Sequence, residues 1–397
     1  MDAVKIDKLR RTFENMYGNA QDRRLLLVLS PGRTEIAGNH TDHEGGCVIA
    51  GAVDRYVEGI FSANDAGVMV VQSEGYGLVE VDATDLDARP EEHGTTASLV
   101  RGMAAQFADR GYAPRGFDAA LRSDVLGGSG LSSSAAFELE LGQAMNQLWA
   151  QGKIPAHELA LMAQRAERQW FGKPCGLMDQ ASVALGGIQY MDFFDPRELK
   201  ATRLDFDFAA NGYAICLVAV GADHAALIGD YAAVPGEMQA VARAFGKERL
   251  AELGEESVIE RVGALRTTHG DRPVLRTLHY YKEQRLVKER MDALCKGDMQ
   301  AFLALTRMSG ASSAMYLQNV SVAGASEQPA MVALALADEL LPEGACRIHG
   351  GGFGGTIQAF VPADKIDAFV AGMDAALGKG SCIVCNIDHE GARAQWL

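Results

Sequence analysis

A glycine- and serine-rich stretch between a predicted strand and a predicted helix is suited to binding phosphate. Residues 125–136 read VLGGSGLSSSAA, and the candidate ligands among them are Gly128, Ser129, Gly130, Leu131, Ser132, Ser133 and Ser134. Glycines let the backbone approach an anion closely, and the N–H groups and dipole at a helix N-terminus attract phosphate. The lysine of a P-loop is absent. A serine-capped helix after a flexible turn is the alternative interpretation.

A second glycine cluster, HGGGFGGT at residues 349–356, contains the spacing GxGxxG. In a dinucleotide-binding fold a helix must follow these glycines. Here residues 356–361 predict a strand instead, so the dinucleotide interpretation is weak. We expect a ligand-binding loop at this cluster, with a tight hinge between domains as the alternative.

Residues 30–46 (SPGRTEIAGNHTDHEGG) gather Arg, Asn, His, Asp and Glu directly after a predicted buried strand at residues 25–29. We expect a loop here, because Ser30, Pro31 and Gly32 should end the strand. Such side chains can bind the hydroxyl groups of a polyol. They could also bind a metal through His40, Asp42, His43 and Glu44, but their irregular spacing fits no standard metal site.

A further candidate is Asp179, which follows a Pro-Cys-Gly turn in residues 166–180 (AERQWFGKPCGLMDQ). An aspartate in such an apolar setting is commonly a helix cap or an ion-pair partner. Taken alone, Asp179 is therefore no more than a candidate for general-base chemistry.

The elements that must position these residues do not alternate strictly between strand and helix. Residues 117–121 predict a strand before the Gly-Ser stretch, residues 135–151 and 155–171 predict helices, and residues 231–340 are mainly helical. This order favours an α+β fold over a doubly wound parallel sheet. We expect one domain at 1–200 and a second at 201–397.

Composition excludes several classes of protein. The 397 residues carry 37 Lys+Arg against 52 Asp+Glu, a net charge of 37 − 52 = −15, with 48% hydrophobic residues. This argues for a globular protein without general affinity for nucleic acid or anionic membranes. Seven scattered cysteines, no long apolar run and no signal-peptide pattern predict a cytoplasmic protein. The CxxC pair Cys382 and Cys385 lies in an apolar predicted strand, so we interpret it as core.

Together these stretches resemble the GHMP kinase superfamily and, within it, the galactokinase family. The resemblance is carried by PGR and HTD at residues 31–33 and 40–42, by GSGLSSSA at 128–135, by KPCGLMDQ at 173–180, and by the glycines at 350–355. These motifs occur in the family's order over nearly the whole chain. The resemblance implies a fold of two α+β lobes with the active site between them.

It also implies roles for particular residues. Asp179 would take the proton from the anomeric hydroxyl of a sugar, and Arg33 would stabilise charge beside it. Ser134 and Glu167 would hold Mg²⁺, and residues 128–134 would hold the triphosphate of ATP. The residues that would surround the sugar are Asn39, His40, Thr41, Asp42 and Tyr231.

Several positions depart from the family pattern. Asn39 stands for a glutamate, His43 for a tyrosine, Glu35 for an asparagine, and His349 for a threonine. Leu126 replaces a proline of the ATP loop, Thr96 replaces a tryptophan near the base, and an arginine pair after Tyr231 is missing. The departures affect sugar and adenine contacts and leave Arg33, Asp179, Ser134 and Glu167 intact.

The resemblance therefore implies an ATP- and Mg²⁺-dependent sugar 1-kinase, with galactose as the expected substrate and a monomer as the expected state. A kinase for an amino sugar or a pentose is the first alternative. A sugar-sensing homologue without turnover is the second, and a zinc hydrolase built on His40, Asp42 and His43 is the third.

Overall fold

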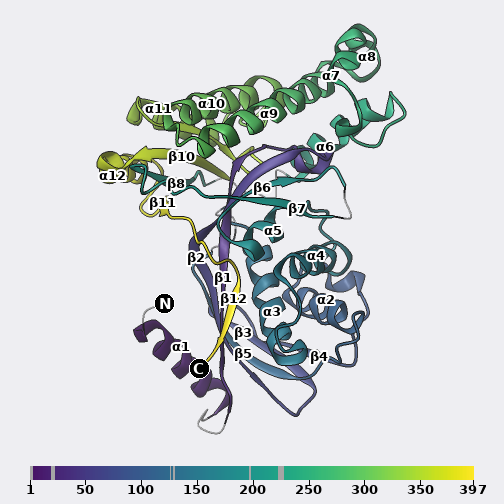
Figure 1. The fold of residues 1–397 in the computed structure, drawn as a ribbon, viewed down its shortest axis with the longest axis vertical. Helices are drawn as coiled ribbons and strands as arrows, with labels where there is room; N and C mark the ends of the chain where they lie inside the picture. The colour runs from purple at the N-terminus through teal and green to yellow at the C-terminus, as the bar shows by residue number, and fades with distance from the viewer. Residues whose placement is uncertain (1–2, 19–22, 126, 128–129, 196–197, 222–227) are drawn as a thin grey trace.

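The computed structural model describes residues 3–18, 23–125, 127, 130–195, 198–221 and 228–397. Its described strands form two sheets, and helices cover both (Figure 1). The first sheet has the order β12-β1-β2-β5-β3-β4, with β6 beside β2 and β7 beside β6. Its strands are β1 (Leu26–Ala37), β2 (Cys47–Ala63), β3 (Val68–Ser73), β4 (Val79–Asp82), β5 (Phe117–Ser123), β6 (Ile188–Asp192), β7 (Lys200–Leu204) and β12 (Arg393–Trp396).

The second sheet has the order β11-β8-β10-β9 and is antiparallel throughout. Its strands are β8 (Tyr213–Ala219), β9 (Ala345–His349), β10 (Thr356–Pro362) and β11 (Cys382–Cys385). Only β3 and β5 pair in parallel in the described part of the first sheet. Long antiparallel sheets with separate groups of helices confirm the predicted α+β class.

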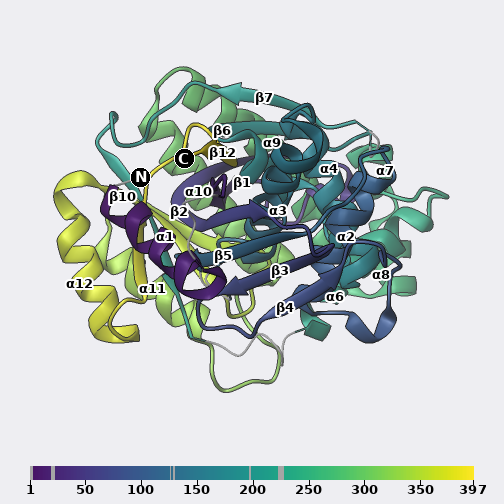
Figure 2. The ribbon, with the colours of Figure 1, turned by 90° about the horizontal axis from the view of Figure 1, so that it is seen from below.

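Strand alternation gives the first sheet two apolar faces. Helices α2 (Thr96–Ala108), α3 (Ser133–Ala150), α4 (Ala156–Ala166) and α5 (Met178–Leu185) lie on one face, and α1 (Ala3–Tyr17) lies on the other (Figures 1 and 2). Leu26 and Val28 belong to the core under the four helices, whereas Leu25 and Leu27 pack with Phe13 of α1. This is the period of two expected of a strand covered on both sides.

The helical half of the chain covers the second sheet. Alanines of α11 (Pro329–Leu340) and Phe369 of α12 (Ile366–Leu377) pack on one face of that sheet. Helix α10 (Met299–Ser312) contributes Phe302 to the core on the opposite face. The remaining described α-helices are α6 (Ile228–Arg243), α7 (Glu255–Glu260), α8 (Val262–His269) and α9 (Asp271–Cys295).

Strand β1 continues where the sequence predicts a break. Ser30, Pro31 and Gly32 remain paired with β2, and the register shifts between Pro31 and Gly32 and again between Glu35 and Ala37. The pairing of β1 with β12 ends at Leu29, so from Ser30 onward no strand among the described residues pairs with this side of β1. An edge position tolerates a proline that cannot donate a hydrogen bond. The prediction of a loop from residue 30 is wrong for residues 30–37, which form a bulged strand.

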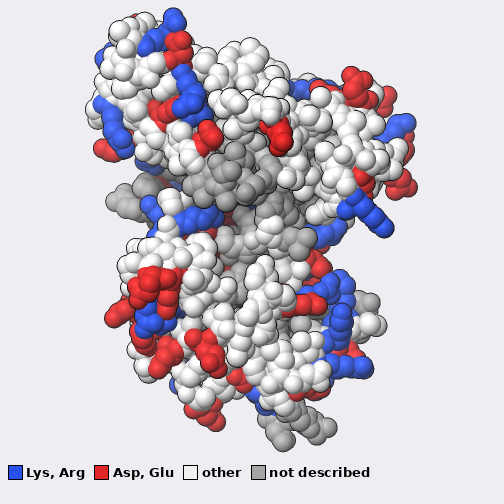
Figure 3. Space-filling model, turned by 180° about the vertical axis from the view of Figure 1, so that it is seen from behind, with Lys and Arg blue, Asp and Glu red and all other residues white. Residues whose placement is uncertain are grey.

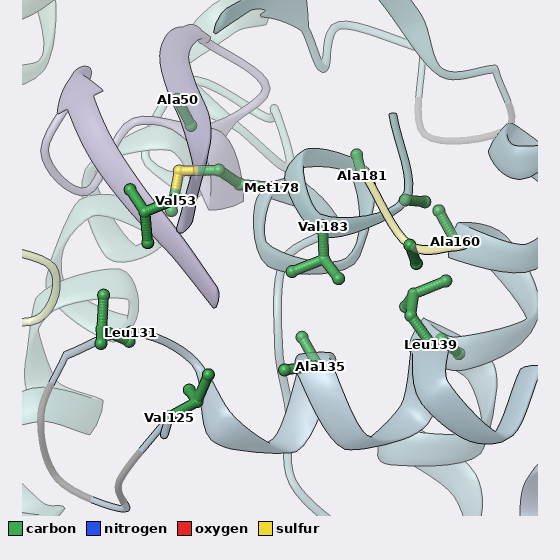
Figure 4. Close-up of a cluster of buried hydrophobic side chains, with 14 of the residues drawn as sticks. Ala50, Val53, Val125, Leu131, Ala135, Leu139, Ala160, Met178, Ala181 and Val183 are labelled. Atoms are coloured by element: carbon green, nitrogen blue, oxygen red, sulfur yellow. The ribbon is translucent and has the colours of Figure 1, made fainter. Parts of the chain in front are cut away.

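An apolar cluster fixes the Gly-Ser stretch against β1. Figure 4 shows Val125 and Leu131 of this stretch, and Met178 of α5 beside Val53 of β2. The Arg33 backbone N–H donates to the Leu131 carbonyl at 3.0 Å. A Cβ atom on Gly32 would lie 3.1 Å from the same carbonyl oxygen, so glycine permits this close approach.

One buried ion pair joins β1 of the first sheet to β9 of the second. Both terminal nitrogens of Arg347 lie 3.0 Å from Glu35 Oε1, and the two side chains are almost fully buried. Breaking such a pair by removing one partner leaves a buried charge uncompensated. The pair therefore ties the strand that carries Arg33 to the strand that ends at the second glycine cluster.

On the face opposite to that seen in Figure 1, acidic and basic side chains are interspersed (Figure 3). Within the described residues, no helix is long and apolar enough to cross a membrane.

We expect Arg347→Met to lower the free energy of unfolding by about 3–5 kcal/mol at neutral pH, because it leaves Glu35 buried without its partner. Burial already raises the pKa of Glu35, and loss of Arg347 removes the main opposing charge. A carboxyl whose pKa is higher in the folded state stabilises folding as pH falls. The deficit should therefore narrow as pH is lowered through the folded-state pKa of Glu35.

Urea unfolding at several pH values measures this deficit. Arg266→Met is the matched control, because Arg266 forms its ion pair with Asp271 on an exposed helical surface. The control should leave the midpoint nearly unchanged. Equal midpoints for the two variants would contradict a stabilising role for the buried pair.

Candidate active site

An ion pair between β1 and α5 lies at the centre of the site. Arg33 Nε donates to Asp179 Oδ1 at 2.6 Å, and a second guanidinium nitrogen donates to the carbonyl of Gly130. The hydroxyl of Ser132 donates to the other oxygen, Asp179 Oδ2. The Asp179 side chain is 25% exposed and that of Arg33 is 9% exposed. The carboxylate is thus oriented by two partners and still has an accessible side.

These partners determine the charge of Asp179. Burial alone would raise its pKa, but the Arg33 guanidinium and the hydrogen bonds from Arg33 and Ser132 more than offset this and hold the pKa below its usual value. Burial likewise opposes the charge on Arg33, and the Asp179 carboxylate restores it, so the pKa of Arg33 is raised. Asp179 is therefore an ionised carboxylate at neutral pH, as a general base must be.

Ser132 precedes α3 but does not cap it. Its backbone is left-handed, with φ 59°, and its hydroxyl bonds to Asp179 rather than to a backbone N–H of the helix. The first N–H groups of this 18-residue helix thus have no side-chain cap. The serine-cap interpretation is contradicted for Ser132, and the first N–H groups of α3, which have no side-chain cap in the described part of the chain, can bind an anion. Gly128 and Ser129, also predicted to contact phosphate, lie outside the described residues.

Glu167 is the centre of a second polar cluster. Its Oε1 accepts from Ser134 Oγ and from Lys173 Nζ, both at 2.8 Å, and its Oε2 accepts from Gln180 Nε2 at 2.7 Å. Burial opposes the charge on Lys173, but Glu167 more than compensates and raises the Lys173 pKa. The Gln180 amide also donates to Glu138 at 3.1 Å, so it bridges two buried carboxyl groups.

Ser134 and Glu167 are brought together as predicted for a metal pair. Two neighbouring ligands of an octahedral Mg²⁺ with bonds of about 2.0–2.1 Å lie about 2.9 Å apart. The 2.8 Å between Ser134 Oγ and Glu167 Oε1 fits that spacing. Lys173 contacts the same carboxylate oxygen, so a cation there would share Glu167 with the ammonium group.

Asp42, Tyr231 and His40 were predicted to contact the sugar, and the structure places them in mutual contact or beside the glycines of the motifs around Asp179. The Asp42 carboxylate lies directly over Gly176, where any Cβ atom would collide with it. Tyr231 is 51% exposed, and partial burial followed by the charges of Asp42 and Asp179 raises the pKa of its phenol to about 12. The Tyr231 ring lies 5.5 Å from that of His40 and packs over Gly351.

Asn39 and Thr41, also predicted to contact the sugar, turn into the protein. Asn39 is fully buried; its amide nitrogen donates to Glu35 and to the Gly350 carbonyl, and its oxygen accepts from Asn319 at 2.8 Å. The Thr41 hydroxyl lies 2.9 Å from the Gly38 carbonyl. Since both the nitrogen and the oxygen of the Asn39 side-chain amide bond to protein atoms, we assign Asn39 a structural role in place of the predicted sugar contact.

The second glycine cluster lies against the same loop. Asn39 bonds to the carbonyl of Gly350, and His40 Nε2 donates to the carbonyl of Gly351 at 3.0 Å. Glycines here also permit a tight contact, because a Cβ atom on Gly352 would lie 2.3 Å from the Asn319 carbonyl oxygen. The cluster thus lies directly against the residues 39–40 that were predicted to contact the sugar.

The zinc alternative does not fit the described geometry. No group of three His, Cys, Asp or Glu side chains among the described residues could hold a metal ion. His40 instead bonds to His43 through Nδ1 at 3.3 Å and to Gly351 through Nε2. Burial lowers the pKa of His40 to about 3, so its ring is neutral.

Sequence reasoning missed Lys173, Gln180 and the structural use of Asn39. Lys173 could have been found, because it follows Glu167 by six residues in a motif with two carboxylates. The direction of the Asn39 side chain had no signal in the sequence, since its partners Gly350 and Asn319 lie about 300 residues away.

Comparisons with known families match two parts of this site. Residues 11–62 match the galactokinase galactose-binding signature, and this range includes Arg33 and residues 39–42. Residues 98–187 match the GHMP kinases N terminal domain, which spans the Gly-Ser stretch, Glu167 and Asp179.

Whole-chain comparisons agree. The chain is 31% identical over 369 residues to a galactokinase from Glaesserella parasuis serovar 5 (strain SH0165), covering 91% of each. It is 32% identical over 348 residues to a galactokinase from Actinobacillus pleuropneumoniae, covering 86% of each. The structure of Lactococcus lactis galactokinase complexed with galactose superposes with a TM-score of 0.83 at 21% identity, covering 99% of this chain and all of the other.

We expect Ser132→Ala to reduce kcat about tenfold to a hundredfold, because a hydrogen bond to a charged group contributes about 1.5–3 kcal/mol. The Ser132 bond lowers the pKa of Asp179. Its loss should therefore move the acidic limb of the kcat–pH profile to higher pH. Nucleotide affinity should change little, in contrast to a serine that bonds phosphate.

Ser134→Ala should instead raise the Mg²⁺ concentration needed for half-maximal activity, because one oxygen ligand is lost. Ser257→Ala, an exposed serine of α7, is the control for both variants. An unchanged pH profile in Ser132→Ala would contradict the role of Ser132 in setting the pKa of Asp179. An unchanged Mg²⁺ titration in Ser134→Ala would contradict the role of Ser134 as a metal ligand.

Proposed function

The chain belongs to the galactokinase family of the GHMP kinase superfamily, and on that premise we propose that it transfers the terminal phosphoryl group of ATP to the anomeric hydroxyl of galactose. The single observation that carries the proposal is the ionised Asp179, held by Arg33 and Ser132 beside an uncapped helix N-terminus. A placed base next to an anion site is what phosphoryl transfer to an alcohol requires.

In the proposed reaction the anomeric hydroxyl gives its proton to the Asp179 carboxylate. The sugar oxygen forms a bond to the terminal phosphorus of ATP, and the bond from that phosphorus to the bridging oxygen of ADP breaks. Arg33 stabilises negative charge at this point and keeps Asp179 ionised before the proton moves. Gly130 and the free N–H groups of α3 hold phosphate oxygens.

Asp42, Tyr231 and His40 would face the sugar. The carboxylate and phenol can bond to sugar hydroxyls, while the His40 ring and the Tyr231 ring form the side of the pocket. Ser134 and Glu167 would hold Mg²⁺, which neutralises phosphate charge when bound. Lys173 would place a further positive charge beside the same phosphates.

A kinase for a related sugar is the second candidate. The buried Asn39 supports this candidate, because it changes one expected sugar contact. The family's glutamate at this position would offer a carboxylate, whereas the Asn39 amide is fully bonded within the protein. One sugar contact is therefore replaced by a structural one. A sugar sensor without turnover is disfavoured, because the pair of Arg33 and Asp179 is intact.

We also propose a cytoplasmic monomer of two lobes that divide near residue 200, with the site between them. The seven cysteines are free, as expected in a reducing compartment. The second sheet begins with β8 at Tyr213, and the last strand, β12, returns to pair with β1.

A panel of free monosaccharides with Mg²⁺–ATP, with ADP release as the readout, tests the proposed substrate. Galactose should give the highest kcat/KM, and phosphorus NMR should place the product's phosphate on the anomeric oxygen. A pentose or an amino sugar ahead of galactose would establish the second candidate. No ADP release with any sugar would contradict both.

We expect Asp179→Asn to lower kcat by about 10²–10⁴-fold, the usual contribution of a general base, while Kd for nucleotide stays within a few-fold of wild type. The amide keeps the shape of the carboxylate but cannot take the proton. Asp367→Asn, on the exposed surface of α12, is the matched control. Activity of Asp179→Asn within a few-fold of wild type would exclude Asp179 as the base.

A further inference from the structure

His349 is a buried side chain that the reaction described above does not use. It is the last residue of β9 and the first residue of the second glycine cluster, and only 2% of it is exposed. Its Nε2 lies 3.0 Å from the backbone nitrogen of Glu35 and 3.1 Å from Thr34 Oγ1. The ring is therefore anchored to β1, the strand that carries Arg33.

These contacts determine the tautomer of His349. A backbone N–H can only donate, so the Nε2 that it contacts carries no proton. Burial and the nearby charges of Arg33 and Arg347 lower the pKa of His349 well below its usual value, so the ring is neutral. The one ring proton must then sit on Nδ1.

This Nδ1–H group has no hydrogen-bond partner among the described residues, although it is buried. The hydroxyl of Thr356, which pairs with His349 across β9 and β10, is also buried without a partner. Two neighbouring donors without acceptors are unusual, because an unsatisfied buried donor carries a full desolvation cost. A ligand atom that accepts hydrogen bonds would remove that cost.

Both donors face the Gly-Ser stretch at Gly130. A Cβ atom on Gly130 would lie 3.0 Å from His349 Nδ1 and 2.8 Å from Thr356 Oγ1. Glycine at this position therefore permits the stretch to lie against the two buried donors, and the Gly130 carbonyl itself accepts from Arg33. Arg33 also bonds to Asp179, so the glycine that the two donors face is joined to the proposed base through one guanidinium group.

We propose that His349 Nδ1–H, with the Thr356 hydroxyl beside it, donates a hydrogen bond to an oxygen of the terminal phosphate of bound ATP. The inference rests on the proposed function, because it requires a nucleotide in the Gly-Ser stretch. A neutral donor fixed before the reaction stabilises the charge of the transferred group without reorganisation. His349 stands where the sequence resemblance places a threonine, so this contact is a property of this chain.

Two amide substitutions separate the nitrogens of the ring. The side chain of His349→Gln places its amide near the position of Nε2, so it can keep the bond to Glu35 but has no donor at the position of Nδ1. The shorter side chain of His349→Asn places its amide near Nδ1 and loses the bond to Glu35. Thr356→Val removes the hydroxyl without changing the shape of the side chain.

The test measures Kd by calorimetry for Mg²⁺ with AMP-PNP, a non-hydrolysable ATP analogue, and for Mg²⁺–ADP. His349→Gln should weaken AMP-PNP binding about tenfold to a hundredfold, the range of one hydrogen bond to a charged acceptor, and leave ADP within about threefold. Thr356→Val should likewise weaken AMP-PNP binding and leave ADP binding nearly unchanged. His349→Asn should keep both affinities and show only a lower Tm. In wild type, AMP-PNP but not ADP should shift the Nδ1–H resonance of His349.

Three outcomes would overturn the inference. His349→Gln could bind AMP-PNP as wild type does, or it could lose AMP-PNP and ADP equally, which would mean that His349 shapes the loop. Alternatively, His349→Asn could lose AMP-PNP while His349→Gln keeps it, which would make Nε2 the important atom. If the wild type neither binds AMP-PNP nor releases ADP with any sugar, the proposed function itself fails, and the inference fails with it.

Discussion

The site depends on a mutual requirement between two buried charges. Burial raises the pKa of Asp179 and Arg33 is the main group that opposes this, while Arg33, which is almost fully buried, has the Asp179 carboxylate as the counter-ion bonded to it. Arg33 lies in the part of β1 that continues past the bulge at Pro31 and Gly32, and from there its side chain bonds to Asp179. The guanidinium also bonds to Gly130, so the base, the strand and the phosphate stretch are held by one side chain.

Strand β1 also joins the two sheets. Within a few residues it pairs Glu35 with Arg347, offers a backbone N–H to His349, and leads to Asn39, which bonds to Gly350. Residues more than 300 positions apart thus meet along one strand. Glycine is required at residues 32, 130, 351 and 352, because a Cβ atom at each would lie unusually close to a neighbouring segment.

The sequence predicted many of the residues that the structure brings together in the candidate site, but it gave little information about where their side chains point. The α+β class and the meeting of Arg33 with Asp179, and of Ser134 with Glu167, follow from ordered motifs. The end of β1 was predicted wrongly, because a proline that usually stops a strand is tolerated at an unpaired edge. Asn39 and Ser132 have the residue types of ligand contacts, but their partners come from distant segments that local patterns do not reveal.

The central claim is that Asp179 is an ionised base because Arg33 and Ser132 stabilise its charge. Carbon NMR of the Asp179 carboxyl carbon, followed during an acid titration with folding checked by circular dichroism, measures this directly. The account predicts that Asp179 titrates below the ordinary aspartate value of about 3.9, or stays ionised until the protein unfolds. A midpoint at or above that value in the folded protein would contradict it.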